Sequence, residues 1–239
     1  MARDFLETYL NKPRSFLFVI GLVLLGLAAW GVMLWRLEAP APVRPVILLI
    51  NRYPLTPADK SFLQQANPYG FLLGIPAHPH LDPRRLRQEL AEVLHRADFV
   101  FFIDQEGGTV NRIKQYDPSF QAPAPEVFGK QAETNLPQAI EAAYQYGVRT
   151  GKFLKNLTID VVFAPLAEQR PTGPNAPHKS RYFSDQPALV QALADAYARG
   201  LADGGVIPCY KHAPGGSAQY EKQTVELPAL EIQSKLLLV

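Results

Sequence analysis

Three apolar runs of the chain are each followed directly by charged side chains. Carboxylates can accept hydrogen bonds or protons, and ammonium, guanidinium and imidazole groups can donate them, so this combination suits the binding or conversion of a polar ligand. An ordinary alternative is that the same groups neutralise one another in a buried ion network. The side chains are Asp104 and Glu106 after the first run, Glu168, Arg170 and Arg181 after the second, and Lys211 and His212 after the third.

Five apolar runs, separated by helical patterns, must position these side chains. The runs are continuous rather than alternating, which is typical of parallel strands buried on both faces. Two of the helical patterns begin with a capping threonine or aspartate directly before a proline. We expect strands at 46–50, 69–75, 98–104, 158–165 and 205–212, and helices starting at Pro57, Pro83, Pro137 and Pro187.

This alternation of strands and helices predicts an α/β fold with right-handed crossovers. The carboxyl ends of parallel strands meet at one rim of such a sheet, where ligands bind. The charged side chains named above should therefore converge there. The pattern leaves open whether the sheet is doubly wound or part of a barrel.

Composition excludes several classes of protein. With 47% hydrophobic and 19% charged residues over 239 positions, the chain is neither disordered nor a coiled coil. A single cysteine, Cys209, excludes an internal disulfide and a multi-cysteine metal site. Residues 1–44 hold five of the 24 basic and three of the 22 acidic residues, so the remainder has no formal net charge and no nucleic-acid partner is expected. His78 and His80 lack a nearby third ligand; we expect no metal and no cofactor.

Residues 15–35 contain no charged side chain and predict a transmembrane helix. Their 21 positions would reach about 31 Å as a helix, enough to cross a hydrocarbon core of about 30 Å. A cleaved signal peptide is the alternative, but its apolar region is normally shorter. The segment is therefore expected to be an uncleaved signal anchor after an N-terminal arm, 1–14, and before a Pro/Ala linker, 36–45.

Four motifs in 46–239 resemble glycoside hydrolase family 3, in particular the bacterial β-N-acetylglucosaminidases. Residues 103–112 (IDQEGGTVNR) resemble the family signature IDQEGGxVxR, and 163–166 (FAPL), 181–184 (RYFS) and 211–215 (KHAPG) are similar to three further motifs in the same order. The resemblance implies a partial (β/α)8 barrel of about five β/α units and a sugar pocket. It also implies that sugar hydroxyls are bound, in vestigial form, by Asp104, Arg181, Lys211 and His212.

Two departures from the family pattern predict that the domain is not catalytic. Aligned without a gap, Lys222 and Thr224 stand where the family has its Asp–His acid/base pair, and they cannot cycle a proton in the same way. The family's nucleophilic aspartate lies on a later strand, beyond Val239. We therefore expect no catalytic residues and a truncated pseudoenzyme.

These observations together predict a non-catalytic accessory or structural subunit of a larger membrane complex. Five strands leave sheet edges open, which normally need a partner. A weak excess of basic residues before the apolar segment predicts a single-pass protein of the bacterial inner membrane with a periplasmic domain. Its partners would be other subunits, the lipid bilayer and an N-acetylglucosamine-containing glycan. The alternatives are a β-N-acetylglucosaminidase, completed by another chain, and a peptidoglycan- or sugar-binding module.

Overall fold

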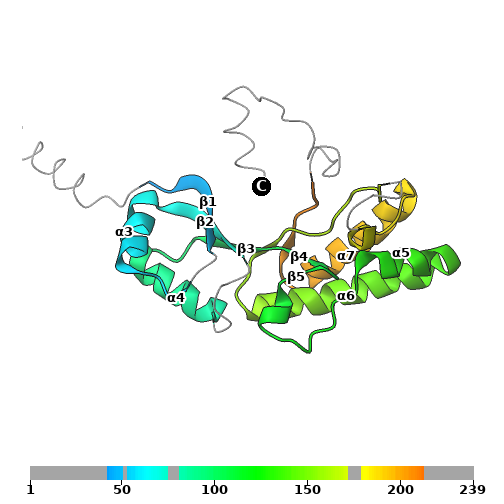
Figure 1. The fold of residues 1–239 in the computed structure, drawn as a ribbon, viewed down its shortest axis with the longest axis horizontal. Helices are drawn as coiled ribbons and strands as arrows, with labels where there is room; N and C mark the ends of the chain where they lie inside the picture. Colours follow the sequence, from blue (N-terminus) through cyan, green and yellow to red (C-terminus); the bar gives the residue numbers. More distant parts are fainter. Residues whose placement is uncertain (1–41, 51–52, 75–80, 172–178, 213–239) are drawn as a thin grey trace, which may run out of the picture. The chain divides into compact units, whose positions relative to one another are not determined.

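A five-stranded parallel sheet forms the centre of the domain. The computed structural model describes residues 42–50, 53–74, 81–171 and 179–212, and the compact unit begins at Val43. The strands pair in the order in which they occur along the chain (Figure 1). They are β1 (Arg44–Ile50), β2 (Pro68–Leu73), β3 (Val100–Ile103), β6 (Val161–Val162) and β7 (Ile207–Pro208).

In the described residues five α-helices accompany the sheet, and each has a proline in its first turn. Proline fits there because the first N–H groups of a helix have no partner within it. The side chain of Thr56 caps the first of these helices in a reciprocal capping box with Asp59, and Asp82 caps the second. The helices are α3 (Pro57–Ala66), α4 (Pro83–Leu94), α5 (Pro125–Thr134), α6 (Leu136–Asn156) and α7 (Pro187–Asp203).

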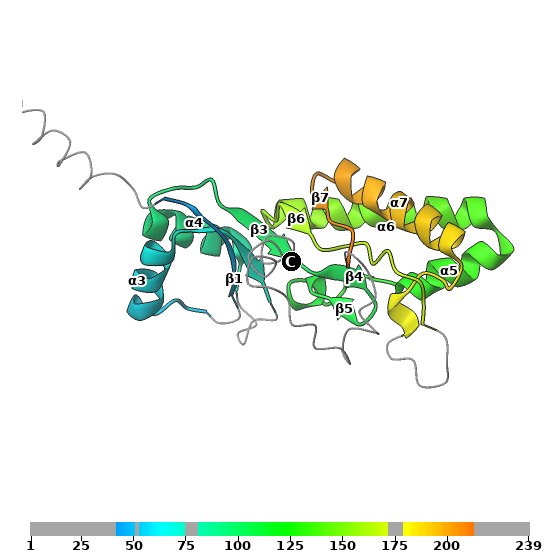
Figure 2. The same ribbon diagram turned by 90° about the horizontal axis from the view of Figure 1, so that it is seen from above.

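The strand order distinguishes between the two α/β architectures that the sequence left open. In a doubly wound sheet the order reverses at one point, so the crossovers cover both faces. Here every crossover moves to the next strand in the same direction, as the view from above also shows (Figure 2). Right-handed crossovers that all advance in one direction place their helices on one face, which is the arrangement of a (β/α) barrel.

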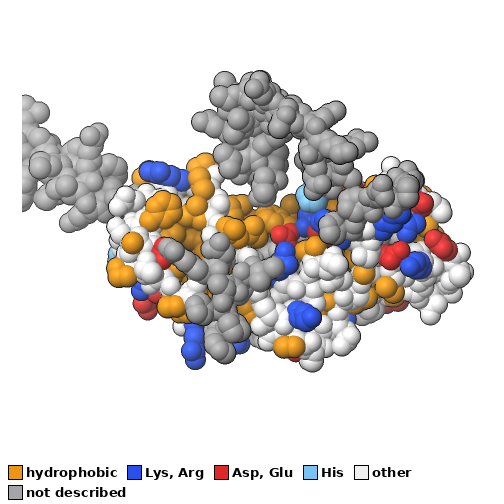
Figure 3. Space-filling model, in the orientation of Figure 1, with side chains coloured by type: hydrophobic (Ala, Val, Ile, Leu, Met, Phe, Trp, Pro, Cys, Tyr) orange, Lys and Arg blue, Asp and Glu red, His pale blue; other side chains and the backbone are white. Residues whose placement is uncertain are grey.

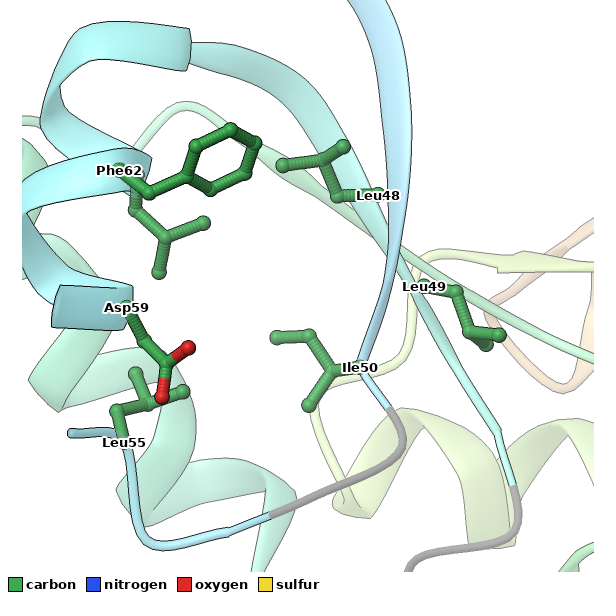
Figure 4. Close-up of a pocket in the computed structure, with 7 residues that line it drawn as sticks. Leu48, Leu49, Ile50, Leu55, Asp59 and Phe62 are labelled. Carbon is green, nitrogen blue, oxygen red and sulfur yellow. The ribbon is translucent and has the colours of Figure 1, made fainter.

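The two faces of the sheet are apolar but differ in how they are covered. Figure 4 shows that Leu48 and Ile50 point from β1 toward α3, across a cavity of about 300 Å³, whereas Leu49 points to the other side. On the helix side, the registered row Ile50, Leu73, Ile103 and Val162 is buried. The opposite row, here called the open row, consists of Leu49, Leu72, Phe102, Val161 and Ile207.

The open row is covered at its centre and exposed at its two ends. Phe102 is buried and stacks on Phe163, with ring centroids 5.4 Å apart. Leu49 and Ile207, on the edge strands β1 and β7, are 56% and 63% exposed. Each edge of the sheet therefore carries a large apolar side chain in contact with water.

Several predictions about the ends of the chain fall outside the described residues. The segment 15–35 does so, and no helix in the described ranges is long and apolar enough to cross a membrane. Lys222 and Thr224 are not described either. The predicted linker, 36–45, lies mostly outside the described residues, and its last two positions, Arg44 and Pro45, belong to β1. Residues before Pro42 are likewise not described.

Candidate functional site

Two carboxylates leave the centre of the sheet at its carboxyl end. Asp104 follows β3 directly, and Glu106 lies in β4 (Gln105–Gly107), which pairs with β5 (Val110–Asn111) as a short antiparallel hairpin. The hairpin turns at Gly107 and Gly108, which have φ angles of 103° and 56°. Glycine adopts this left-handed region without the steric cost that other residues pay. The Gly-Gly pair therefore turns the chain back immediately after Glu106.

Two cations bind these carboxylates. The ammonium Nζ of Lys211, which follows β7, lies 2.6 Å from Oδ1 of Asp104 and 2.6 Å from Oε1 of Glu106. Arg181, at the end of a 3₁₀ turn (Lys179–Arg181), donates from Nε and Nη2 to the two oxygens of Glu106, each over 2.8 Å. We call Asp104, Glu106, Arg181 and Lys211 the ion cluster. All four members are among the charged residues that the sequence predicted to converge.

Burial gives the ion cluster its electrostatic character. The side chain of Glu106 is fully buried, and those of Lys211 and Arg181 are only 12% and 21% exposed. Burial alone would raise the pKa of Glu106, but hydrogen bonds from Arg181 and the charge of Lys211 lower that pKa below its ordinary value. The hydrogen bonds to Glu106 raise the pKa of Arg181 in turn. Glu106 is thus held as a carboxylate, neutralised by two cations.

The remaining candidates lie at two different places. His212 is beside the ion cluster in sequence and contacts Glu168: Nδ1 and the backbone N–H lie 2.9 Å and 3.1 Å from Oε1 of that carboxylate. The side chain of Glu168 is 8% exposed and that of His212 is 44% exposed. Arg170 instead faces Glu126 of α5 and Asp185, at 3.5 Å and 3.7 Å, so it does not join the site.

The described part of the chain contains no group of three or more metal-ligating side chains. Cys209 is a half-buried free thiol, and burial raises its pKa above the ordinary value, which makes it a weaker nucleophile and metal ligand. His78 and His80 lie outside the described residues.

The geometry of the site suits a ligand rich in hydroxyl groups. Asp104 is 31% exposed at its side chain and can accept hydrogen bonds, while Lys211, which contacts it, and the next residue, His212, can donate them. Charged groups with fixed geometry at a strand-end rim confer orientation and specificity on a polar ligand. Basic and acidic side chains meet beside a hydrophobic surface over the strands in Figure 3.

Comparison with known proteins establishes the family. The profile described as the glycosyl hydrolase family 3 N terminal domain matches residues 82–238, which include all four motifs named above. The chain therefore belongs to glycosyl hydrolase family 3 through this N-terminal domain, and the predicted resemblance is confirmed.

Curated relatives carry the name β-hexosaminidase. The chain is 32% identical over 132 residues to the β-hexosaminidase LpqI of Mycobacterium tuberculosis, covering 54% of this chain and 32% of that protein. It is 28% identical over 177 residues to a β-hexosaminidase of Chromobacterium violaceum, covering 73% of this chain and 48% of the relative. The chain thus spans about half the length, or less, of these relatives.

Solved structures agree with this assignment. NagZ from Neisseria gonorrhoeae, in complex with N-trifluoroacetyl-D-glucosamine, superposes with a TM-score of 0.63 at 28% identity, covering 73% of this chain and 51% of that one. The β-N-acetylglucosaminidase from Thermotoga maritima, at 22% identity and a TM-score of 0.56, shows the shared fold. The predicted α/β, barrel-type architecture is confirmed at this level.

The sequence predicted Glu106 at the rim but not its role as the residue that joins the ion cluster. The resemblance to the family did not include Glu106 among the sugar-contacting residues, although it lies two positions from Asp104 in the same motif. Sequence reasoning also missed Gln105 and Tyr197, which contact each other behind Glu106. No pattern in the sequence indicates that a tyrosine of α7 reaches this strand.

Proposed function

We propose that this domain binds a terminal N-acetylglucosamine-type sugar at the carboxyl end of its sheet. The observation that carries the proposal is the position of Lys211, whose ammonium lies 2.6 Å from both Asp104 and Glu106 at the rim. Membership of the family and the N-trifluoroacetyl-D-glucosamine bound to gonococcal NagZ support this class of ligand.

The chemistry of the rim supports the same ligand class. Asp104 offers a partly exposed carboxylate, which can accept hydrogen bonds from two neighbouring hydroxyls. Lys211 and His212 can donate to ring or hydroxyl oxygens. Glu106 is fully buried, whereas the side chains of Asp104 and His212 are 31% and 44% exposed, so these two are the most accessible to a ligand.

We further propose that this chain binds its ligand without hydrolysing it. Retaining glycosidases need a proton donor for the leaving oxygen and a nucleophile, and the family's acid/base pair aligns with Lys222 and Thr224 in this sequence. The competing proposal is hydrolysis of β-N-acetylglucosaminides, which the names of the relatives favour.

A binding measurement and a turnover measurement on the full chain separate these proposals. Calorimetric titration with N-acetylglucosamine should show binding, with a Kd between about 10 μM and 10 mM. Asp104→Asn should weaken it about tenfold, whereas Asp195→Asn on α7, whose carboxylate accepts an exposed hydrogen bond from Tyr210, should not. Release of nitrophenol from a chromogenic N-acetyl-β-glucosaminide at about 1 per second or faster would establish hydrolysis instead.

The open row supports a second role, as an accessory subunit of a membrane complex. Leu49 and Ile207 expose large apolar side chains at the two sheet edges, and such edges are normally covered by a partner. With the predicted anchor at 15–35 and the excess of basic residues before it, we propose that the domain lies on the periplasmic side of a bacterial inner membrane. Protease added to intact spheroplasts should then digest the domain, and complete protection there would contradict this orientation.

A further inference from the structure

Buried polar side chains form hydrogen bonds around the hairpin that carries Glu106. The side chain of Gln105 is fully buried, and its Oε1 accepts hydrogen bonds from the backbone N–H groups of Arg112 and Ile113, at 2.8 Å and 3.1 Å. Its Nε2 lies 3.4 Å from the hydroxyl of Tyr146. These contacts fix the hairpin that begins directly after Asp104.

Tyr197 of α7 binds the backbone directly before Glu106. Its hydroxyl donates to the carbonyl oxygen of Gln105 over 2.8 Å, and this carbonyl belongs to the peptide bond that leads into Glu106. The Tyr197 ring is buried and stacks on Tyr146, with centroids 5.0 Å apart and planes 14° apart. Burial raises the pKa of Tyr197 well above its ordinary value, so the hydroxyl remains a donor throughout the physiological range.

The residue that follows Glu106, Gly107, is tightly packed. A Cβ on Gly107 would lie 2.2 Å from the carbonyl oxygen of Pro123 and 3.1 Å from the hydroxyl of Tyr146. In the chain, Glu106 therefore lies between the Gln105 carbonyl, which accepts a hydrogen bond from Tyr197, and Gly107, which packs against Tyr146. Its side-chain carboxylate extends from this fixed backbone to Arg181 and Lys211.

We propose that Tyr197 is a positioning residue for the ion cluster: through the Gln105 carbonyl it fixes Glu106, and through Glu106 it fixes the ammonium of Lys211 at the sugar-binding rim. The part of this proposal that concerns affinity rests on the proposed sugar binding. The part that concerns the placement of Lys211 does not, and it can be measured without a ligand.

A pair of matched tyrosine variants tests the proposal. Tyr197→Phe keeps the stacked ring and removes only the hydroxyl that reaches Gln105. Tyr144→Phe, on the neighbouring helix α6, removes a hydroxyl that donates to Asp203 over the same 2.8 Å, away from the site. Both variants are studied as the full chain, at a temperature where circular dichroism shows each to be folded.

The first measurement is the rate at which trace acetic anhydride acylates Lys211, followed by mass spectrometry. Lys130, 65% exposed on α5, serves as the reference amine in the same sample. Loosening of Glu106 should free the Lys211 ammonium, so Tyr197→Phe should raise the ratio of the two rates about fivefold, and Tyr144→Phe should leave it unchanged. An unchanged ratio in Tyr197→Phe, or an equal rise in both variants, would overturn the proposal.

The second measurement is the affinity for N-acetylglucosamine. Tyr197→Phe should raise the Kd about fivefold or more, and Tyr144→Phe should not. Wild-type protein that binds no sugar would contradict the proposed function, and the acylation ratio would still decide the role of Tyr197. Wild-type protein that binds sugar with the same Kd as Tyr197→Phe would overturn the positioning role in binding.

Discussion

Arg181 binds both oxygens of the Glu106 carboxylate, each over 2.8 Å, although Glu106 lies in β4 and Arg181 ends a 3₁₀ turn 75 residues later in the chain. Lys211 approaches one of the same oxygens, so Glu106 is shared by two cations. With Asp104 as the second carboxylate, the ion cluster has two negative and two positive members. Removal of any one member leaves an unbalanced charge in a largely buried place.

Lys211→Met should destabilise the domain and abolish sugar binding. The substitution keeps the length of the side chain but leaves Asp104 and Glu106 without their shared ammonium, while Arg181 still holds Glu106. We expect the free energy of unfolding to fall by about 2 to 3 kcal/mol, measured by urea denaturation. Lys130→Met, which removes an exposed pair with Glu126, should cost less than about 0.5 kcal/mol. If both variants lose the same free energy of unfolding, the ion cluster stabilises the domain no more than an exposed ion pair does.

The stability of the domain should fall in acid because of Glu106. Its folded-state pKa is lowered, since the bonds from Arg181 and the charge of Lys211 outweigh burial. The folded state therefore favours the carboxylate, and this stabilisation is complete above the ordinary value of 4.5 and is lost as the pH falls through the lower folded-state pKa. Urea unfolding between about pH 6 and 3 should show this loss in wild type.

Two glutamine variants provide the comparison for this pH series. Glu106→Gln should be less stable at neutral pH and should lose less stability on acidification, because the titrating group is gone. Glu133→Gln removes an exposed carboxylate from α5 and should follow the wild-type curve. If the free energy of unfolding falls as steeply below pH 4.5 in Glu106→Gln as in wild type, groups other than Glu106 cause the acid sensitivity.

The sequence predicted the framework of the fold well because strong local signals mark it. Apolar runs bounded by capped helices identified all five strands of the described sheet, and a helix begins at Pro187 as predicted. The expected strands at 158–165 and 205–212 were too long: only Val161–Val162 and Ile207–Pro208 pair in the sheet. Apolar character reflects burial rather than strand pairing: residues 158–160 and 163–165 are buried or half-buried, but they lie outside β6. Beyond β7, Tyr210 and His212 are exposed, and Lys211 forms only an isolated parallel bridge with Leu166.

The helix α5 (Pro125–Thr134) and the hairpin β4–β5 were not predicted. The helix is short and lacks a side-chain cap at Ala124, so its start resembles an ordinary proline-rich loop.

The convergence of Asp104, Lys211 and Arg181 followed from the rule that parallel strands end at one rim. The partners of each charge, and the contact of Tyr197 with Gln105, depend on tertiary packing that no local pattern contains.

Gly200→Ala should test how tightly α7 must pack to present Tyr197. Gly147 and Gly151 of α6 face Gly200 and Gly204, and a Cβ at Gly200 would lie 2.2 Å from the backbone oxygen of Tyr144. Because backbone atoms cannot yield as a flexible side chain can, the helices must separate, at a cost of about 1 to 3 kcal/mol in unfolding free energy. Arg199→Ala, at an exposed neighbouring position, should change stability by less than about 0.5 kcal/mol. A Gly200→Ala variant as stable as Arg199→Ala would show that the crossing is looser than the structure indicates.

Charged substitutions at the ends of the open row should reduce association without unfolding the domain. Leu49 and Ile207 are 56% and 63% exposed, so Leu49→Lys and Ile207→Lys remove little buried surface and should change the unfolding free energy by less than about 0.5 kcal/mol. An edge strand with a lysine is a poor template for pairing with another chain, because the new contact would bury its charge. Sedimentation velocity of the detergent-solubilised full chain should therefore show a smaller associated fraction in each variant than in wild type.

The control variant is Val127→Lys, which adds the same charge on α5, outside the open row. Val127 is 53% exposed, and this variant should sediment like wild type. If all three variants sediment alike, the sheet edges do not mediate association, and the accessory-subunit proposal loses its structural support.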